Sequence, residues 1–343
     1  MAWLLLCVPQ AGFGLYPRRL SLWGVHMYGK QILFAAVLFL GCNPKSLPQS
    51  TGLSSQYEKI EGFDATTCTF DKDDPFETRE RISKGPNAGL CLDSRKARPL
   101  VILNELQAKN YGGSAKDVLT VANVSHLGRF YVAHIPVSKI KAAIFQLEYF
   151  PAAVPAGHTQ LRMQFEEGSP VTLVSQSKAG NTEVHRVQDL VMSVEALGQP
   201  GYKYDIFKGM KDHYSAVYRM TSLDEKYDHM ITKQKHRVEQ WKLNVNAEEA
   251  RKIVELYVKG SQENGMREMY HTLERNCTNE IVAAIDAGMK YNLFEKFGRF
   301  TAKTTDFYPN VIRISLQKRG LLPRLGKGND LPELDKDPSI LRN

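Results

Sequence analysis

The 343-residue sequence is poor in cysteine and lacks the short motifs that hold metals, nucleotides or nucleic acids. Its five cysteines are widely spaced and form no Cys-x-x-Cys pair, which excludes a zinc cluster of the usual spacing. Neither a Gly-rich phosphate loop nor a nucleic-acid-binding module is evident. Several histidines show no metal-ligand spacing and are interpreted as surface residues: His134, His213, His229, His236 and His271. We therefore expect no metal, no cofactor and no nucleic-acid partner.

The composition is that of an ordinary globular protein. Hydrophobic residues make up 43% and charged residues 24% of the chain, which excludes a disordered, collagen-like or disulfide-dense protein. The length fits one large domain or two modest ones. The formal net charge of +8 favours an anionic neighbour, either nucleic acid or an acidic membrane surface. Because no nucleic-acid module is present, the membrane is the expected neighbour.

The apolar run 32–41 is too short to cross a bilayer comfortably as a helix. A basic stretch precedes it and Cys42 follows it, which is the layout of a secretory signal. Leu40-Gly41-Cys42 also resembles a bacterial lipobox, whose cysteine takes a diacylglycerol. We therefore predict a signal segment over 1–42, with Met27 as an alternative start and Cys42 as the lipid anchor. A plain signal peptide and an uncleaved anchor stay open, and each of these alternatives exports the protein.

Two further segments precede the part of the sequence that is patterned like a folded domain. Residues 43–57 are rich in Ser and Pro and are interpreted as a polar linker. Residues 58–128 are interpreted as a turn-rich N-terminal extension. Within it, Cys68 and Cys91 are natural disulfide partners in an oxidising compartment, and their bridge would close a loop worth about 3 kcal/mol in chain entropy. Two independent buried thiols are the alternative.

From Arg129 the pattern is first that of strands and then that of helices. Strands are predicted over 130–135, 143–149, 159–165, 171–174 and 189–196. Helices are predicted after an Asn246 cap, from Cys277 to Ala287, and within 309–318. Strands followed by helices indicate an α+β fold for residues 129–322, and residues 323–343 are expected to be a loose tail.

His158 is the first candidate for chemistry. A Pro/Gly turn precedes it and places it at the start of the predicted strand 159–165. Strand alternation puts His158 on one face with Gln160, Arg162 and Gln164. This polar face is predicted to meet either solvent or a cleft.

Cys277 is the second candidate. Asn276 is a good N-cap, which places Cys277 in the first turn of a helix, where free N–H groups and the helix dipole lower the pKa of a thiol. Ile281 and Ile285 continue an apolar stripe, so the thiol is expected at the seam between helix and sheet. A nucleophilic thiol needs a base, and His158 on a facing strand is a suitable partner. A small buried cysteine and a structural histidine are the alternatives.

The segments around these two residues resemble the Lnb N-terminal periplasmic domain family. The likeness covers roughly residues 140–320. It rests on these segments in this order: Gly157-His158-Thr159, the Gly/Tyr-rich stretch 201–214, the strand-then-helix stretch 237–249, Tyr270, Asn276-Cys277-Thr278 and Tyr308-Pro309-Asn310.

The resemblance implies a permuted papain-like (NlpC-like) domain, in which an antiparallel sheet packs against the cysteine-bearing helix. It implies that Cys277 is the nucleophile and His158 its base, with Asn276 and Thr278 supporting the oxyanion or the helix cap. It also implies a reaction in which a thiolate takes an acyl chain from a phospholipid and passes it to the amino group of a lipidated cysteine. The residue that orients His158 is open; a backbone carbonyl is one option, and the side-chain candidates are Ser193, Gln164 and His185.

The sequence therefore predicts an exported, membrane-anchored, thiol-dependent acyltransferase of the bacterial envelope, with membrane phospholipid or a lipoprotein as partner. A cysteine hydrolase (amidase or peptidase) with the same site and a non-catalytic lipoprotein are the alternatives. Family members carry a membrane-embedded C-terminal portion, whereas this sequence ends in a polar stretch. Contact with the bilayer is expected to come from the lipid on Cys42 and from the basic surface.

Overall fold

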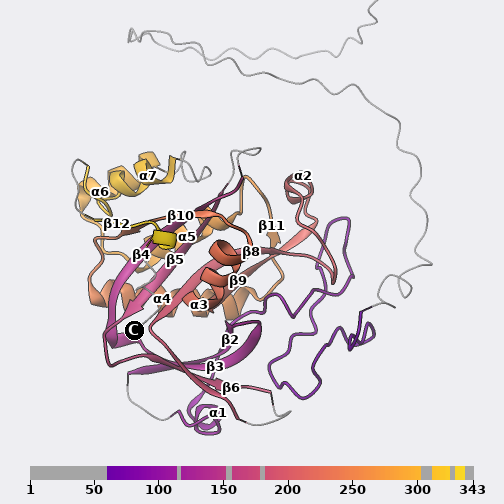
Figure 1. Cartoon of the computed structure of the whole chain (residues 1–343). Helices are drawn as coiled ribbons and strands as arrows, with labels where there is room; N and C mark the ends of the chain where they lie inside the picture. Colours follow the sequence, from indigo (N-terminus) through magenta and orange to yellow (C-terminus); the bar gives the residue numbers. More distant parts are fainter. Residues whose placement is uncertain are drawn as a thin grey trace, which may run out of the picture. The chain divides into compact units, whose positions relative to one another are not determined.

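The computed structural model describes residues 60–113, 117–151, 157–177, 182–302, 311–324 and 329–336. These residues form an α+β fold in which helices pack on an open, largely antiparallel sheet (Figure 1). The α+β class predicted from the sequence is thus confirmed. The predicted signal segment 1–42, with the lipid anchor Cys42, and the linker 43–57 lie outside the described residues.

In the described part of the chain the sheet has twelve strands. Its main path runs β12 (Asp330–Leu331), β10 (Arg237–Lys242), β4 (Ile140–Tyr149), β5 (Gly157–Phe165), β8 (Asp189–Leu197), β9 (Tyr214–Ser222), β2 (Val118–His126), β3 (Arg129–Pro136), β6 (Val171–Ser175), β7 (Val184–Val187). Two short strands lie off this path: β1 (Val101–Ile102) pairs with β2, and β11 (Met269–Tyr270) pairs with β9. The five strands predicted from the sequence fall within β3, β4, β5, β6 and β8.

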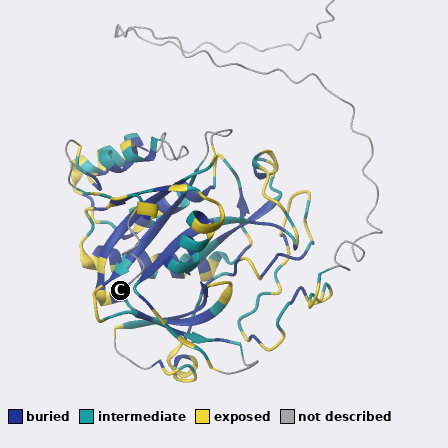
Figure 2. Cartoon of the chain, viewed as in Figure 1, coloured by how far each residue is buried: buried dark blue, intermediate teal, exposed yellow. Residues whose placement is uncertain are grey.

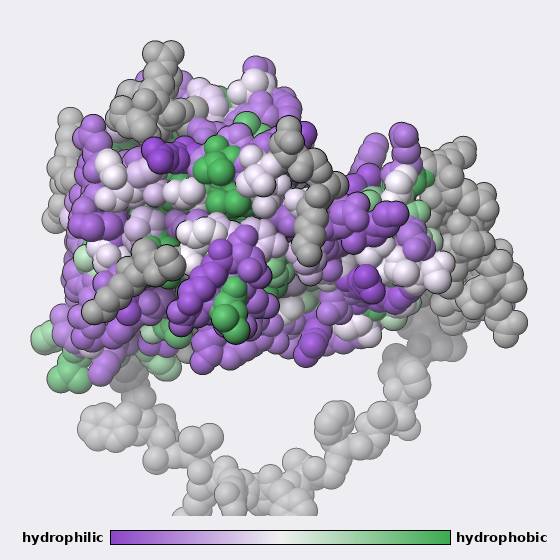
Figure 3. Space-filling model, turned by 90° about the horizontal axis from the view of Figure 1, so that it is seen from below, coloured by the Kyte–Doolittle hydropathy of each residue, from purple (hydrophilic) through white to green (hydrophobic). Residues whose placement is uncertain are grey.

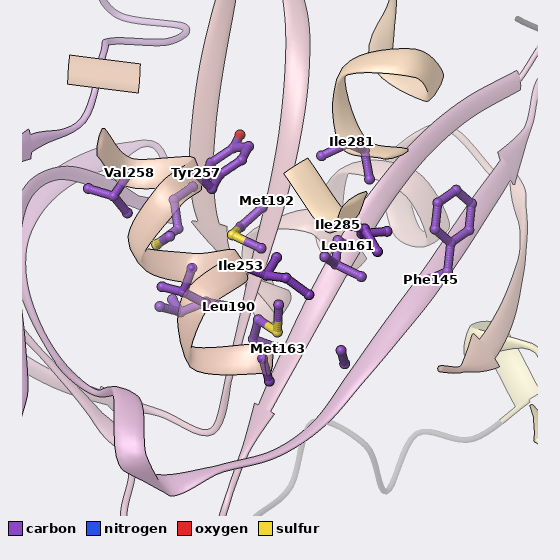
Figure 4. Packing of buried hydrophobic residues seen from close by; sticks show 14 of the residues in the cluster. Phe145, Leu161, Met163, Leu190, Met192, Ile253, Tyr257, Val258, Ile281 and Ile285 are labelled. Atoms are coloured by element: carbon purple, nitrogen blue, oxygen red, sulfur yellow. The ribbon is translucent and has the colours of Figure 1, made fainter. Parts of the chain in front are cut away.

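Two helices cover one face of this sheet: α4 (Ala247–Asn264) and α5 (Cys277–Gly288). Strand alternation directs Leu161 of β5 toward them, where it is buried with Met192 of β8, Ile253 of α4 and Ile285 of α5 (Figure 4). Figure 2 shows the strands as the mainly buried centre of the fold, with exposed residues concentrated on helices and loops. This packing fixes the start of α5 at the seam with the sheet.

The opposite face of the sheet is polar but largely buried. Gln160 and Arg162 are 0% and 1% exposed, so the prediction that this face meets solvent or a cleft is wrong at these two positions. Buried polar groups need partners. Arg162 Nε donates to Asp189 Oδ1 at 2.7 Å, and Gln160 Nε2 donates to Gln146 Oε1 at 2.9 Å.

His236 belongs to the same buried polar layer and does not lie freely on the surface as predicted. Its side chain is only 12% exposed, and its Nδ1 lies 2.6 Å from Oε1 of Glu148. Glu148 is itself buried, and a buried carboxylate is stable only with such a partner. The surface interpretation of His236 is therefore wrong.

Shorter helices complete the fold. They are α1 (Glu105–Lys109), η1 (Val137–Lys139), α2 (Ile206–Gly209), α3 (Leu223–Tyr227), the π-helix η2 (Asp228–Lys233), α6 (Leu293–Ala302), α7 (Ile312–Lys318) and η5 (Leu334–Lys336). None of the helices in the described ranges is long and apolar enough to span a lipid bilayer. The predicted helices are found as α4, α5 and α7.

Part of the predicted loose tail is packed against the sheet. Leu331 pairs with Gln240 of β10, and Leu334 is fully buried in a cluster with Met230 and Val238. The loose-tail prediction is therefore wrong for residues 329–336, because a hydrophobic side chain at position 334 covers the second face of the sheet.

The N-terminal extension contributes to the same sheet and carries the predicted disulfide. Cys68 and Cys91 are bonded, with a Cα–Cα distance of 5.3 Å. β2 lies within residues 58–128, yet it pairs with β3 on the other side of Gly128. The extension and the domain predicted over 129–322 thus share one sheet.

Removing the disulfide by the double substitution Cys68→Ala and Cys91→Ala is expected to lower the free energy of unfolding by about 3 kcal/mol. The bridge closes a loop between residues 23 positions apart, and opening it gives the unfolded chain more conformations. Denaturant unfolding of the oxidised wild type and the variant measures the difference. Wild type treated with reductant is the control and should lose a similar amount. An unchanged unfolding midpoint in the variant would contradict this prediction.

Candidate active site

The first part of the site is the place where β5 and β8 stop pairing. The ladder between them runs from Gln164↔Asp189 to Leu161↔Met192 and ends there. Continued by three residues, the same register brings His158 opposite Glu195. The two side chains do meet: His158 Nε2 lies 3.3 Å from Glu195 Oε1.

The second part of the site is the first turn of α5. Asn276 caps this helix, because its Oδ1 accepts the N–H of Thr278 at 2.9 Å and that of Asn279 at 3.0 Å. Cys277 follows the cap and is 4% exposed. Thr159 Oγ1 donates to Thr278 Oγ1 at 3.2 Å, which ties the start of α5 to the start of β5. Cys277 and His158 are thereby held side by side.

The two side chains lie close enough to shift each other's pKa. Burial alone would raise the pKa of Cys277, but the charge of His158, with polar interactions from the His158 ring and the Thr159 backbone, lowers it below its ordinary value. Burial alone would lower the pKa of His158, but Glu195 and Cys277 raise it. The arrangement therefore favours a thiolate beside an imidazolium.

Glu195 is the carboxylate that faces His158. Its Oε1 accepts from Lys226 Nζ at 2.9 Å and from Ser193 Oγ at 2.7 Å. Although burial raises the pKa of Glu195, Lys226 and His158 outweigh it and hold that pKa well below its ordinary value. Glu195 is thus ionised at neutral pH and can fix the orientation of the imidazolium.

Sequence reasoning missed Glu195, and the three side-chain candidates for its role lie elsewhere. Ser193 is two residues along β8 and contacts Glu195 rather than the histidine. Gln164 lies at the other end of β5, opposite Asp189. His185 is on β7, several strands away, with its Nε2 3.7 Å from Glu183 Oε2. The signal that identifies Glu195 is the register of two strands, which the sequence alone does not supply.

A pair of tyrosines forms the wall of the site beside the thiol. Tyr270 lies close to the backbone of Cys277 and meets Tyr204 in an edge-to-face contact, with 6.2 Å between the ring centroids. Burial raises the pKa of both tyrosines, so both stay protonated at neutral pH. The Tyr204 and Thr272 hydroxyls lie 3.2 Å apart, and Thr272 Oγ1 donates to Ile206 O at 3.1 Å, which fixes α2 as the rim of the site.

The resemblance assigns Asn276 and Thr278 to the oxyanion or the helix cap. In the structure the N–H groups of Thr278 and Asn279 point to the Asn276 side chain, which caps α5. The Cys277 N–H and the adjoining Tyr270 hydroxyl remain beside the sulfur. Among the described residues no cluster of three or more His, Cys, Asp or Glu side chains is arranged to hold a metal ion.

The fold and this cluster together define an α+β protein with a buried cysteine beside a partly buried histidine and carboxylate, where a helix meets a sheet. The Lnb N-terminal periplasmic domain family matches residues 129–305, just over half of the chain, and the protein belongs to this family. No curated protein and no solved structure matches the chain. Membership of a periplasmic domain family and the Cys68–Cys91 disulfide indicate an envelope protein outside the cytoplasm.

Proposed function

We propose that this protein is a thiol-dependent acyltransferase of the bacterial envelope with a permuted papain-like site, acting on phospholipid and lipoprotein. In this proposal Cys277 is the nucleophile, His158 the acid and base, and Glu195 the residue that orients His158. The observation that carries it is the thiolate-favouring pair of Cys277 and His158 beside an ionised Glu195. Such an environment distinguishes a reactive cysteine from a structural one. Lipid attachment at Cys42 is part of the same proposal.

In the first half of the reaction the Cys277 thiolate attacks the ester carbonyl of a phospholipid. A carbon–sulfur bond forms, the ester carbon–oxygen bond breaks, and the leaving oxygen takes the proton held by His158. The products are an acyl thioester on Cys277, a lysophospholipid and a neutral His158.

In the second half an amine, such as the N-terminal amine of a lipidated cysteine, attacks the thioester. Its surplus proton passes to His158, a carbon–nitrogen bond forms and the carbon–sulfur bond breaks. The thiolate and the imidazolium are restored together. A thioester suits this step because a thiolate with a lowered pKa is a good leaving group.

The negative charge on the carbonyl oxygen needs donors near the sulfur during both halves. In this proposal the Cys277 N–H and the protonated Tyr270 hydroxyl turn from their resting contacts, with each other and with Tyr204, to supply them.

The substitution Tyr270→Phe is expected to lower the rate of acyl transfer about 10²-fold, because it removes one oxyanion donor and leaves the ring in place. The rate of single-turnover acylation measures the effect. Tyr214→Phe is the matched control, since Tyr214 lies in the same tyrosine cluster but donates to Lys203 O. Equal losses in the two variants would indicate a packing role for Tyr270.

Transfer and hydrolysis are separated by their products. The purified protein is given phospholipid vesicles with a diacylated lipopeptide, and mass spectrometry identifies what is formed. A triacylated peptide with stoichiometric lysophospholipid is the expected result. Free fatty acid without triacylated peptide would show that the protein is a hydrolase using the same cysteine and not a transferase. If neither product forms, Cys277 has a structural role and not a catalytic one.

A further inference from the structure

α6 carries an unusual concentration of exposed hydrophobic side chains. Leu293, Phe294, Phe297 and Phe300 are 81%, 90%, 70% and 72% exposed. Ile314 of the neighbouring α7 is 50% exposed. By contrast, the face of the molecule in Figure 3 is mainly hydrophilic, with small and separate hydrophobic areas. Four large apolar side chains on one ten-residue helix therefore call for a partner.

These four side chains lie on the outer side of α6. At about 100° per residue they span an arc of about 120°. The opposite side packs on α7: Ala302 is fully buried, and a Cβ added to Gly298 would clash with the carbonyl oxygen of Lys318. Packing thus turns the apolar arc away from the protein.

The surroundings of this arc carry an excess of positive charge. Residues 289–302 and 311–324 contain seven Lys and Arg and a single acidic residue, Glu295. Four of the seven form ion pairs with acidic residues outside these ranges: Lys290 with Glu248, Arg299 and Arg319 with Asp286, and Arg313 with Asp330. Lys296 is exposed next to Phe297 and adds to the remaining excess. A second copy of the chain would bring this positive charge against itself, whereas an anionic lipid surface would neutralise it.

We infer that α6, with α7 beneath it, is a membrane-docking surface that inserts Leu293, Phe294, Phe297 and Phe300 into the interface of an anionic phospholipid bilayer. A short amphipathic helix with aromatic side chains on one side and cations around them is suited to lie in that interface. In Figure 1, α6, α7 and the α2 rim of the candidate site reach the same upper edge of the molecule. Docking through α6 therefore leaves that rim on the side of the lipid.

Fluorescence of the full chain bound to vesicles tests the insertion directly. Phe294→Trp is expected to show a blue-shifted emission with vesicles containing phosphatidylglycerol, and quenching when their acyl chains are brominated. The shift should weaken with pure phosphatidylcholine vesicles. Leu106→Trp on α1 is the matched control, because Leu106 is 75% exposed but lies on a different helix. An unshifted, unquenched signal from the Phe294→Trp variant would overturn the inference, and so would a shift that depends only on protein concentration.

A second measurement links docking to turnover and rests on the proposed function. The double substitution Phe294→Gln and Phe297→Gln is expected to lower turnover of vesicle phospholipid about tenfold. Turnover of a soluble short-chain ester should be unchanged, and Leu106→Gln should change neither rate. If the protein has no acyl-transfer activity, the fluorescence result still decides the docking surface. Unchanged vesicle turnover in an active protein would count against docking through α6.

Discussion

Acyl transfer is expected to fall by at least about 10³-fold when Cys277 is replaced by Ser. The hydroxyl keeps the shape of the site, but its pKa is far above that of the thiol, so His158 cannot hold it as an anion. Single-turnover acylation from vesicle phospholipid measures the loss. Circular dichroism and the unfolding midpoint should stay close to those of the wild type, because Ser differs from Cys by one atom.

The matched control removes the other two cysteines of the described residues, Cys68 and Cys91. Cys68 and Cys91 form their disulfide within the N-terminal extension, so Cys68→Ala with Cys91→Ala should retain transfer at temperatures where the variant is folded. A Cys277→Ser variant that transfers acyl chains at the wild-type rate would eliminate the thiol mechanism. A comparable loss in both variants would point to unfolding as the cause.

Glu195→Gln is expected to lower acyl transfer about 10²-fold and to move the alkaline limb of its pH profile to lower pH. Glu195 helps raise the pKa of His158, so the imidazolium that protonates the leaving oxygen survives to high pH in the wild type. Without the carboxylate charge that pKa falls, and the proton is lost at lower pH. A shift of about one pH unit corresponds to about 1.4 kcal/mol. The acid limb is set by the lowered pKa of Cys277.

Glu225→Gln is the control for this variant. Glu225 lies in the same polar layer and is paired with Arg219, but it does not contact His158. The amide introduced by Glu195→Gln still offers an oxygen to Lys226 Nζ, so the fold of that variant should persist. An unchanged alkaline limb in Glu195→Gln, or an equal shift in Glu225→Gln, would contradict the orienting role of Glu195.

Local patterns were sufficient to predict much of this fold. Period-two alternation identified β5, and the Asn caps identified the starts of α4 and α5, because these signals act between residues close in sequence. The Cys68–Cys91 bridge was predicted from the oxidising compartment and from the turn-rich stretch that contains both cysteines, and it is present in the structure. The association of His158 with Cys277 was suggested first by their residue types, a thiol at a helix start and a histidine at the start of a facing strand, and then by the family resemblance.

What the sequence could not supply was the contact between distant segments. Glu195 meets His158 through the β5–β8 register, and Tyr270 meets the Cys277 N–H through β11. Arg162 was expected to face solvent or a cleft, because its partner Asp189 lies on another strand. Leu334 looked like part of a loose tail for the same reason: only the folded sheet offers the surface that buries it.

The most direct test of the central claim is the intact mass of the protein after incubation with phospholipid in the absence of an amine acceptor. The account predicts a mass increase of one acyl chain, located on Cys277, released by neutral hydroxylamine and absent from Cys277→Ala. Addition of a diacylated lipopeptide should then transfer the chain and restore the original mass. Turnover of phospholipid without an acyl group on Cys277, or an acyl group carried by another residue, would contradict the account.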